Sequence, residues 1–546
     1  MKVISVKWLD INKGDAKAPN YRSRLVGREL NLKKRDDLFA GTPPLESLRY
    51  ILSKAASKKD HLVMAIDVRR AYFYAPATRA VYIDIPPEDK QPGDEGMVGK
   101  LNLSLYGTRD AAMNWVKAYT QVLVENGFVI GKHSAQNFWH AEKEVAVTVH
   151  GDDFTATGRE ERLAWLNKIL SDAFGIKTEV LGPDRKRHKQ EIRVLNRVLT
   201  WDDEHGIGYE ADPRHAELVI RELGLEAAKP VSTPGSKEDA NKALQENGAE
   251  VSTLRMSEDG VEAGEPDETL LEAGEAIRFR GIVARLNYLA QDRPDLRYAT
   301  KEASRAMANP RQGDWITLKR IGRYLRGCPR LRHWFLWQSS SSLVNTYVDS
   351  DWAGCKRTCR STSGGVVMYG KHVLRTWSAT QGVVALSSAE AELYAMIKGA
   401  AETLGMLSLA NDFGDTLDGR VHSDAAAAIG IINRTGVGKL RHLRVQYLWL
   451  QDKVRRAELM VQKVPGVENP ADLLTKHLAA DTMNKHLRRL QCEVMESRAS
   501  TAPTLHQVQE SGWISRTGEE KADGDRQEEE DKWSQEGERV VRRHGR

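Results

Sequence analysis

Three acidic side chains in the first third of the chain could bind metal ions: Asp67, Asp152 and Asp153. The adjacent carboxylates of Asp152 and Asp153 repel each other, and a divalent cation offsets that repulsion. Asp67 and Asp152 could together hold two magnesium ions, which stabilise the attacking and the leaving oxygens of a phosphoryl transfer. From spacing alone, a strand-end aspartate and an acidic turn that both face water remain an alternative.

Four further acids stand where strands are expected to end or helices to begin: Asp349, Glu392, Asp424 and Asp472. Hydrolysis of a phosphodiester by a metal-activated water needs two divalent ions around one phosphate, and therefore carboxylates from separate elements. This reaction requires no nucleophilic side chain. Acids in the first turn of a helix also interact favourably with the helix dipole, so Glu392 and Asp472 have a purely structural explanation too.

Short strands must position the first group of acids. The apolar run Val63–Val68 carries Asp67 near its end. The β-rich runs Val145–Val149 and Phe154–Thr157 flank the acidic pair, so the pattern predicts a strand, a tight turn at Gly151 and a second strand.

A strand-rich segment followed by helices must position the second group. The predicted elements are strands over Asn345–Val348, Gly365–Tyr369 and Val373–Trp377, a helix over Ala389–Leu409 with Ser388 as its N-cap, a strand over Arg420–Ser423 and a helix opened by Asn469. Three strands, a helix, a strand and further helices, with acids at these ends, form the arrangement of a ribonuclease H fold.

The length of 546 residues allows several domains, and the 40% hydrophobic and 29% charged residues fit a globular protein. The net charge of +5 is only a weak argument for nucleic-acid binding. The acidic segment 236–275 and the charged segment 497–546 have little to bury and are expected to be disordered. Pro294 and Pro310 are expected to break the helices of the segment 279–337.

Several classes of protein are excluded by the sequence. Four cysteines do not make a disulfide framework, and no second ligand pair accompanies Cys355 and Cys359, so these two are expected to be ordinary thiols. Met1–Asp15 has no apolar signal region, and no uncharged run is long enough to cross a bilayer. An intracellular protein is therefore expected.

The first part of the chain, from Trp8 to about Pro234, resembles the reverse transcriptase of copia-type long-terminal-repeat retrotransposons. The matching blocks are Tyr21–Val26, Asp67–Tyr72, Ser104–Gly107 with Trp115, and Asp152-Asp153. The resemblance implies that Asp67, Asp152 and Asp153 are the catalytic metal ligands of a polymerase.

The resemblance gives further residues a role. Tyr72 lies where such polymerases place the ring that excludes a ribose 2′-hydroxyl, and a core aromatic is the alternative. Arg22 and Arg24 could contact the incoming triphosphate, and solvated strand charges are the alternative. His150 and Gly151 depart from the family, which usually has Tyr and an apolar residue before the acid pair. The ring that supports the primer terminus is therefore changed, which leaves polymerase efficiency open.

The second group of acids lies in a segment that closely resembles the copia-type ribonuclease H. The matching blocks are Trp352–Gly354, Arg360–Gly364, Trp377-Ser378, Ser387–Glu392, Arg441–Leu443 and Ala471–Lys476. The resemblance implies that the metal ligands are Asp349, Glu392, Asp424 and Asp472. Asp351 and Glu390 are lesser candidates, and His442 is expected to be structural or adjacent to the substrate. The segment 279–337 resembles the copia-type connection between polymerase and nuclease.

These patterns predict an α/β (α+β) protein with several domains. The expected order is reverse transcriptase fingers and palm with an antiparallel sheet at 1–235, an insertion at 236–275, a helical thumb or connection at 276–342, a ribonuclease H-like domain with a mixed five-stranded sheet at 343–478, and a helix with a charged tail at 479–546.

The expected function is RNA-directed DNA polymerisation coupled to degradation of the RNA, with two Mg²⁺ or Mn²⁺ ions in each active site. An impaired retrotransposon relic that folds and binds nucleic acid without efficient polymerisation is the alternative. Expected partners are an RNA template, a DNA primer, an RNA–DNA hybrid and deoxynucleoside triphosphates, and no membrane. The capsid, protease and integrase parts of such a polyprotein are also expected partners, in cytoplasmic particles or in the nucleus.

Overall fold

The computed structural model describes residues 3–12, 21–30, 38, 40–236, 256–257, 260–261, 269–355, 358–436, 438, 442, 445–503 and 541–544. Most of the predicted acidic insertion and most of the predicted charged tail lie outside these residues, as do Arg441 and Leu443. Within the described ranges, no helix is both long and apolar enough to cross a membrane.

A six-stranded antiparallel sheet forms the centre of the first part of the chain. Its order is β11-β4-β10-β9-β8-β7, with β4 at His61–Val68, β7 at Val129–Ile130, β8 at Asn137–His140, β9 at Val145–His150, β10 at Asp153–Arg159 and β11 at Ile176–Leu181. The predicted hairpin is confirmed, because β9 and β10 pair antiparallel across a turn that contains Gly151.

Helices cover both faces of this sheet. Successive strand residues point to opposite faces, so Met64 and Ile66 pack against α2 (Ala111–Glu125) and α3 (Glu160–Ala173), whereas Val63 shares a core with α1 (Leu45–Ser57). Asp67 follows Val63 at an even spacing and therefore lies on the α1 side of β4.

Smaller β structures complete the first part. β2 (Val6–Asn12) and β3 (Tyr21–Gly27) form a hairpin. A separate sheet has the order β1-β5-β6-β24, with β1 at Val3–Ile4, β5 at Tyr82–Asp84, β6 at Val98–Leu101 and β24 at Val541–His544. Two short 3₁₀ helices lie at Ala71–Tyr74 and Pro87–Asp89, and β15 (Met256–Ser257) pairs with β16 (Gly260–Val261).

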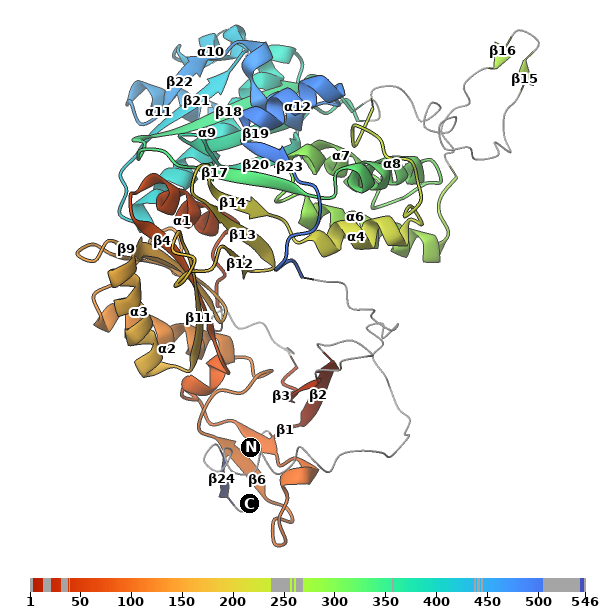
Figure 1. Ribbon diagram of the computed structural model, residues 1–546. Helices are drawn as coiled ribbons and strands as arrows, with labels where there is room; N and C mark the ends of the chain where they lie inside the picture. The colour runs from red at the N-terminus through yellow and green to blue at the C-terminus, as the bar shows by residue number, and fades with distance from the viewer. Residues whose placement is uncertain are drawn as a thin grey trace.

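A five-stranded antiparallel sheet lies in the middle of the molecule, between the first sheet and the last (Figure 1). Its order is β12-β13-β14-β17-β23, with β12 at Glu191–Val194, β13 at Arg197–Asp202, β14 at Gly206–Glu210, β17 at Leu331–Leu336 and β23 at Cys492–Val494. Three distant stretches of the chain therefore meet in one sheet.

A helical layer packs beside this sheet (Figure 1). It contains α4 (Pro213–Glu222), α6 (Ala273–Leu289), α7 (Pro294–Ser304) and α8 (Asp314–Gly327), and α12 (Ala480–Arg489) joins the same core. Both predicted breaks are confirmed: Pro294 is the first residue of α7, and Pro310 lies between α7 and α8.

The last sheet is mixed and five-stranded, as predicted. Its order is β20-β19-β18-β21-β22, with β18 at Leu343–Asp351, β19 at Thr362–Tyr369, β20 at His372–Thr380, β21 at Asp418–Ser423 and β22 at Met460–Lys463. β21 pairs parallel to β18 and β22, and the other pairs are antiparallel. Its helices are α9 (Ser388–Asp412), α10 (Ala426–Ile432) and α11 (Trp449–Arg455), with 3₁₀ helices at Val445–Leu448, Gly466–Glu468 and Pro470–Leu474.

The first and last parts of the chain share one hydrophobic core. Leu48 and Leu52 of α1 belong to the same cluster of buried residues as Val348 of β18, Leu374 of β20 and Met396 of α9. The last sheet and its helices therefore pack directly against the first part through α1.

Candidate active sites

Three carboxylates from three different elements converge beside the last sheet. Ligand atoms of Asp349 on β18, Glu392 on α9 and Asp424 just after β21 all lie within 4.8 Å of one another. Among the described residues, this is the one such group of three or more acidic, histidine or cysteine side chains. Three of the four acids that were predicted to share a site therefore lie together in the folded chain.

Gly364 and the side-chain amide of Asn469 allow the segment that carries the fourth acid, Asp472, to lie close to this cluster. Gly364 pairs with Asp349 across β18 and β19, and a Cβ on Gly364 would lie 2.7 Å from the Thr475 side chain. The Asn469 amide donates to the backbone oxygen of Val348 at 2.8 Å, and its oxygen accepts from the Ala471 amide. The segment that carries Asp472 can therefore pack closely against the strand that carries Asp349.

Burial and mutual repulsion raise the pKa values of the clustered acids. Burial, with the nearby Glu392 carboxylate, holds the pKa of Asp349 well above its usual value. Burial and the Asp424 charge raise the pKa of Glu392 to about 7. Burial also raises the pKa of Asp424, with a further contribution from Asp472. Such clustered, unneutralised carboxylates are the environment that a divalent cation stabilises.

Lys476 neutralises part of the negative charge of these acids. Its ammonium lies 2.8 Å from the Asp472 carboxylate and 3.8 Å from that of Asp349. Thr475 donates a short hydrogen bond to Asp349. Neither residue was predicted to act in the site, although the spacing of four residues between Asp472 and Lys476 is usual for an ion pair on a helix. Asp472 contributes charge to the cluster but does not belong to its tight group.

The donor set fits a divalent metal. Oε1 of Glu392 accepts from the amide and the hydroxyl of Ser350, both at 3.1 Å. Oε2 of Glu392 is buried and has no hydrogen-bond partner. Leaving a buried charged oxygen without a partner is costly, so this atom is a ready ligand for a cation.

The lesser candidates lie outside this cluster. Asp351 accepts a short hydrogen bond from the Thr362 amide. Glu390 accepts from Tyr394 at 2.8 Å and from the Leu386 amide at 2.9 Å, and it pairs with His442 at 3.0 Å. His442 thus has a structural partner. The predicted N-cap is wrong by one residue, because Ser387 rather than Ser388 caps α9 and accepts from the Glu390 amide.

The three acids predicted to serve a polymerase lie together at the end of the β9–β10 hairpin. Asp67 and Asp153 are direct partners in the antiparallel pair of β4 and β10, so their side chains point to the same face. Asp152 lies in the turn, and its carbonyl accepts from the Val68 amide at 3.1 Å. Burial and the charges of Asp152 and Asp67 raise the pKa of Asp153 to about 6. The three carboxylates do not form a tight ligand group among the described residues.

Two tyrosines lie near Asp152, and an arginine packs over one of them. The rings of Tyr72 and Tyr106 lie 4.5 Å apart, and the Arg24 guanidinium lies 5.1 Å from the centre of the Tyr106 ring. Burial, with the Asp152 charge, raises the pKa values of both tyrosines. Tyr72 is half-buried, and its ring packs against that of Tyr106.

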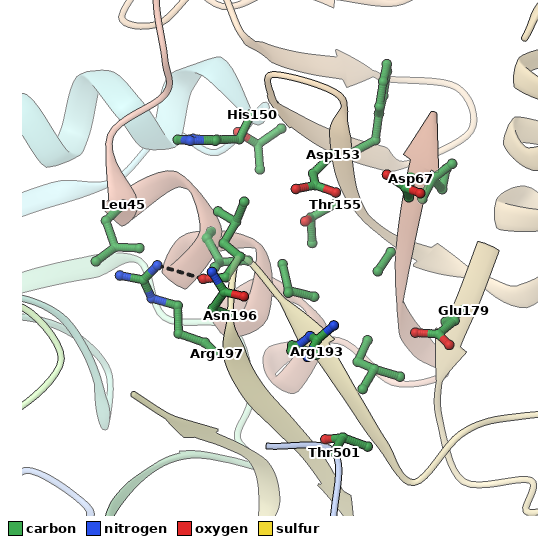
Figure 2. Close-up of a pocket in the computed structure, with 18 of the residues that line it drawn as sticks. Leu45, Asp67, His150, Asp153, Thr155, Glu179, Arg193, Asn196, Arg197 and Thr501 are labelled. Atoms are coloured by element: carbon green, nitrogen blue, oxygen red, sulfur yellow. Dashed lines mark hydrogen bonds between the residues drawn. The ribbon is translucent and has the colours of Figure 1, made fainter. Parts of the chain in front are cut away.

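A trough of about 1000 Å³ opens beside these acids. Figure 2 shows Asp67 and Asp153 on its sheet side and Arg193 and Arg197 on the opposite side, at the β12–β13 hairpin. Arg22 also lines the trough and is exposed. Arg193 is exposed there, whereas the Arg197 guanidinium is buried and ion-paired with Asp292 at 3.0 Å. Acids on the sheet side and the exposed guanidinium of Arg193 on the opposite side suit a phosphate-bearing ligand held through a metal.

His150 and Gly151, the two residues before the acid pair, have defined contacts in the β9–β10 turn. Gly151 has a φ of +69°, a region in which a β-branched residue is strained. The Trp115 indole donates to the carbonyl oxygen of Gly151 at 2.8 Å and so fixes the turn. His150 lines the trough, and burial, with the charge of Arg197, lowers its pKa.

Comparisons with known proteins agree with this geometry. Residues 1–182 match the family described as reverse transcriptase (RNA-dependent DNA polymerase). The chain is 27% identical over 493 residues to the retrovirus-related Pol polyprotein from transposon TNT 1-94 of Nicotiana tabacum, covering 87% of this chain and 34% of the relative. It is 26% identical over 504 residues to that from transposon RE2 of Arabidopsis thaliana, covering 89% of this chain and 32% of the relative.

The chain spans about a third of the length of these polyproteins. Among solved structures, the foamy viral protease-reverse transcriptase in complex with an RNA/DNA hybrid aligns with 86% of this chain and 51% of its own, at 10% identity and a TM-score of 0.46. The family match and the long alignments to transposon polyproteins agree with the acid-bearing hairpin and the mixed sheet. The chain belongs to the Pol polyproteins of copia-type retrotransposons.

Proposed function

We propose that this chain copies RNA into DNA and degrades the RNA strand of the resulting hybrid, with a two-metal site for each reaction. The observation that carries the nuclease half of the proposal is the convergence of Asp349, Glu392 and Asp424 within 4.8 Å, and the pairing of Asp67 with Asp153 supports the polymerase half. Carboxylates from three separate elements have no structural reason to meet in a buried place unless a cation compensates them.

In the nuclease site, Asp349, Glu392 and Asp424 would hold the ions, with Asp472 at the edge. Divalent ions supply an activated water and stabilise the leaving oxygen. The protein's own contribution is to fix the carboxylates: Ser350 holds one oxygen of Glu392 and leaves the other free, and Thr475 orients Asp349.

In the polymerase site, Asp67 and Asp153 point to one face, and Asp152 lies at the turn beside them. Ions bound there would be shared with the triphosphate of the incoming nucleotide. We assign the ring of Tyr72 to the sugar of that nucleotide, and Arg24 and Arg22 to its phosphates. Tyr106 packs against Tyr72 and restricts the position of that ring.

The proposed function also assigns each part of the chain to a domain. We assign 1–235 to the polymerase fingers and palm, 276–342 to a helical thumb or connection, and 343–478 to the nuclease. The chain would act on an RNA template, a DNA primer and their hybrid, together with the capsid, protease and integrase parts of its polyprotein.

A relic with impaired polymerisation is a second candidate, and the hairpin favours it. His150 is half-buried at the trough, where the family has a tyrosine, and the polymerase carboxylates are not gathered into a tight ligand group within the part of the chain described. The nuclease cluster carries no such departure. This candidate predicts hybrid cleavage without efficient primer extension.

Cleavage of a labelled RNA–DNA hybrid by the full chain, with and without magnesium, tests the nuclease. The parent should cut the RNA strand and spare duplex DNA, and Asp349→Asn should abolish cutting while leaving hybrid binding, since phosphate contacts elsewhere carry most affinity. Asp418→Asn is the matched control, because Asp418 is an exposed acid of β21 outside the cluster. Unchanged cutting by Asp349→Asn contradicts the assigned site.

A further inference from the structure

The far end of helix α9 is held by the first part of the chain. The Asp412 carboxylate, at the last residue of α9, accepts hydrogen bonds from the amides of His133 and Ser134, each at 2.9 Å, and from the Asn137 side chain at 3.1 Å. Asp412 is only 6% exposed. All three donors lie at the β7–β8 turn of the six-stranded sheet.

Helix α1 binds the same end of α9. The Lys54 ammonium donates to the backbone oxygen of Phe413 at 2.9 Å and lies 2.6 Å from the Asp415 carboxylate. The Tyr50 hydroxyl donates to Asp415 at 2.9 Å, and the Tyr50 and Phe413 rings stack at 5.7 Å with an angle of 10°. Polar and apolar contacts therefore fix the same few residues.

The two surfaces approach at glycines. A Cβ on Gly131 would lie 2.5 Å from the Asp412 carboxylate, and a Cβ on Gly414 would lie 2.3 Å from the Trp139 indole nitrogen. Gly414 also has a φ of +78°, which favours glycine. We name the contact of Asp412–Asp415 with Tyr50, Lys54 and residues 131–139 the α9 clamp.

The negative charge of Asp412 destabilises the helix on which it lies. A carboxylate at the C-terminus of a helix interacts unfavourably with the helix dipole. Buried charge without partners would add a further penalty. Among the described residues, the donors to the Asp412 carboxylate lie at the β7–β8 turn and offset both costs, so Asp412 serves the contact between the two parts of the chain.

The same helix carries Glu392 near its other end. α9 runs over 25 residues, and a single helix transmits an anchor at one end to the orientation of the other. The turn that holds Asp412 belongs to the sheet that carries Asp67 and Asp153. One rigid path therefore connects the two acidic sites.

We propose that the α9 clamp fixes the nuclease acids at one separation from the polymerase acids, with Asp412 and Lys54 as positioning residues. This inference rests on the proposed function. A primer 3′ end seated at Asp67 and Asp153 then places the RNA strand at Glu392 at one set number of base pairs from that end. Loosening the clamp widens the range of cut positions while leaving the chemistry of each cut unchanged.

The test maps cut positions. The full chain is given an end-labelled RNA template with a recessed DNA primer, and products are resolved at single-nucleotide length. The parent should give one main cut at a set distance from the primer end. The variant with both Asp412→Ala and Lys54→Met should spread its products over several positions. Ser408→Ala is the matched control, because this exposed hydroxyl on α9 donates only to its own helix.

Hydrogen exchange gives a readout that does not depend on activity. The amides of His133 and Ser134 should be protected in the parent and should exchange at least about tenfold faster in Asp412→Ala, because each loses a bond to a charged acceptor. The Asp412→Ala variant needs only to fold for this measurement, which circular dichroism checks.

The outcomes separate the inference from the function on which it rests. No cutting by the parent overturns the proposed nuclease and the inference with it. The inference alone is overturned if the parent cuts the RNA at positions unrelated to the primer end. It is also overturned if the double variant cuts at the same positions as the parent. Fast exchange of the His133 and Ser134 amides in the parent also overturns it.

Discussion

Replacing one acid of the cluster of Asp349, Glu392 and Asp424 should make the metal-free protein more stable. The change is Glu392→Gln, which keeps the shape of the side chain and removes its charge. Glu392 lies beside Asp349 and Asp424, and one of its oxygens is buried without a partner. Removing the charge should therefore relieve burial cost and repulsion that the folded chain bears whenever no cation is bound.

The size of the gain follows from the pKa of Glu392. Burial and the Asp424 charge raise it from 4.5 to about 7, which corresponds to about 3 kcal/mol of destabilisation when the carboxylate is fully ionised. Because the pKa is raised in the folded state, the folded protein binds the proton more tightly than the unfolded chain. The destabilisation is absent below pH 4.5, grows as the pH rises, and is complete above about pH 7.

Thermal unfolding in the presence of a chelator measures this effect. At pH 8 the midpoint of Glu392→Gln should exceed that of the parent by several degrees, and the difference should vanish near pH 4.5. Magnesium should raise the midpoint of the parent more than that of the variant, since binding to the folded state stabilises by mass action.

Glu390 provides a control of opposite sign. It is two residues earlier on the same helix, and burial, which opposes its ionisation, is outweighed by hydrogen bonds from His442, the Leu386 amide and Tyr394 that lower its pKa. Glu390→Gln should therefore destabilise the protein. Equal shifts in the two variants, or a loss of stability in Glu392→Gln under chelator, would refute the assignment of Glu392 to an uncompensated acidic cluster.

Three other predictions follow from the same contacts. Asp67→Asn should abolish primer extension on an RNA template while leaving the unfolding midpoint near that of the parent, and a variant that extends primers normally would show that Asp67 is not a metal ligand. His150→Tyr should raise primer extension if the change in the hairpin impairs polymerisation. Adding Gly151→Val should lower the free energy of unfolding by about 1–2 kcal/mol, because Gly151 has a positive φ. Urea unfolding of each variant separates the effect on stability from the effect on extension. His333 and His372 are buried, and their pKa values are lowered to about 4, so each favours the folded state only when it is neutral. As the pH drops from 6.5 towards 4, the urea midpoint of the parent should fall relative to that of His372→Gln, because the variant has lost one of these two histidines.

Local sequence determined the elements and the acids at their ends. The alternation of β-branched and apolar residues in Val145–Val149 and Phe154–Thr157 predicted the β9–β10 hairpin, and the apolar runs after residue 343 predicted the three strands before α9. These features depend on residues within a few positions of one another, so their spacing is visible in the sequence. A helix boundary depends on a single hydrogen bond, which is why the N-cap fell on Ser387 and not on Ser388.

Tertiary structure decided which acids share a site. Asp349, Glu392 and Asp424 meet because β21 lies parallel to β18 and α9 packs against both. Asp472 was expected to be their equal, but Lys476 binds its carboxylate and leaves it at the edge of the cluster. No spacing in the sequence distinguishes the fourth acid from the other three.

The α9 clamp was not foreseen, and the physical reason is the distance along the chain. Asp412 and the amides of His133 and Ser134 are separated by more than half of the described length, and a backbone donor leaves no signature in residue type. Lys54 lies on α1 and Asp415 follows the end of α9, so no spacing along the sequence links the two. Packing of α1 against the last sheet buries Lys54 beside Asp415, so only the folded chain shows that the two halves hold each other in place.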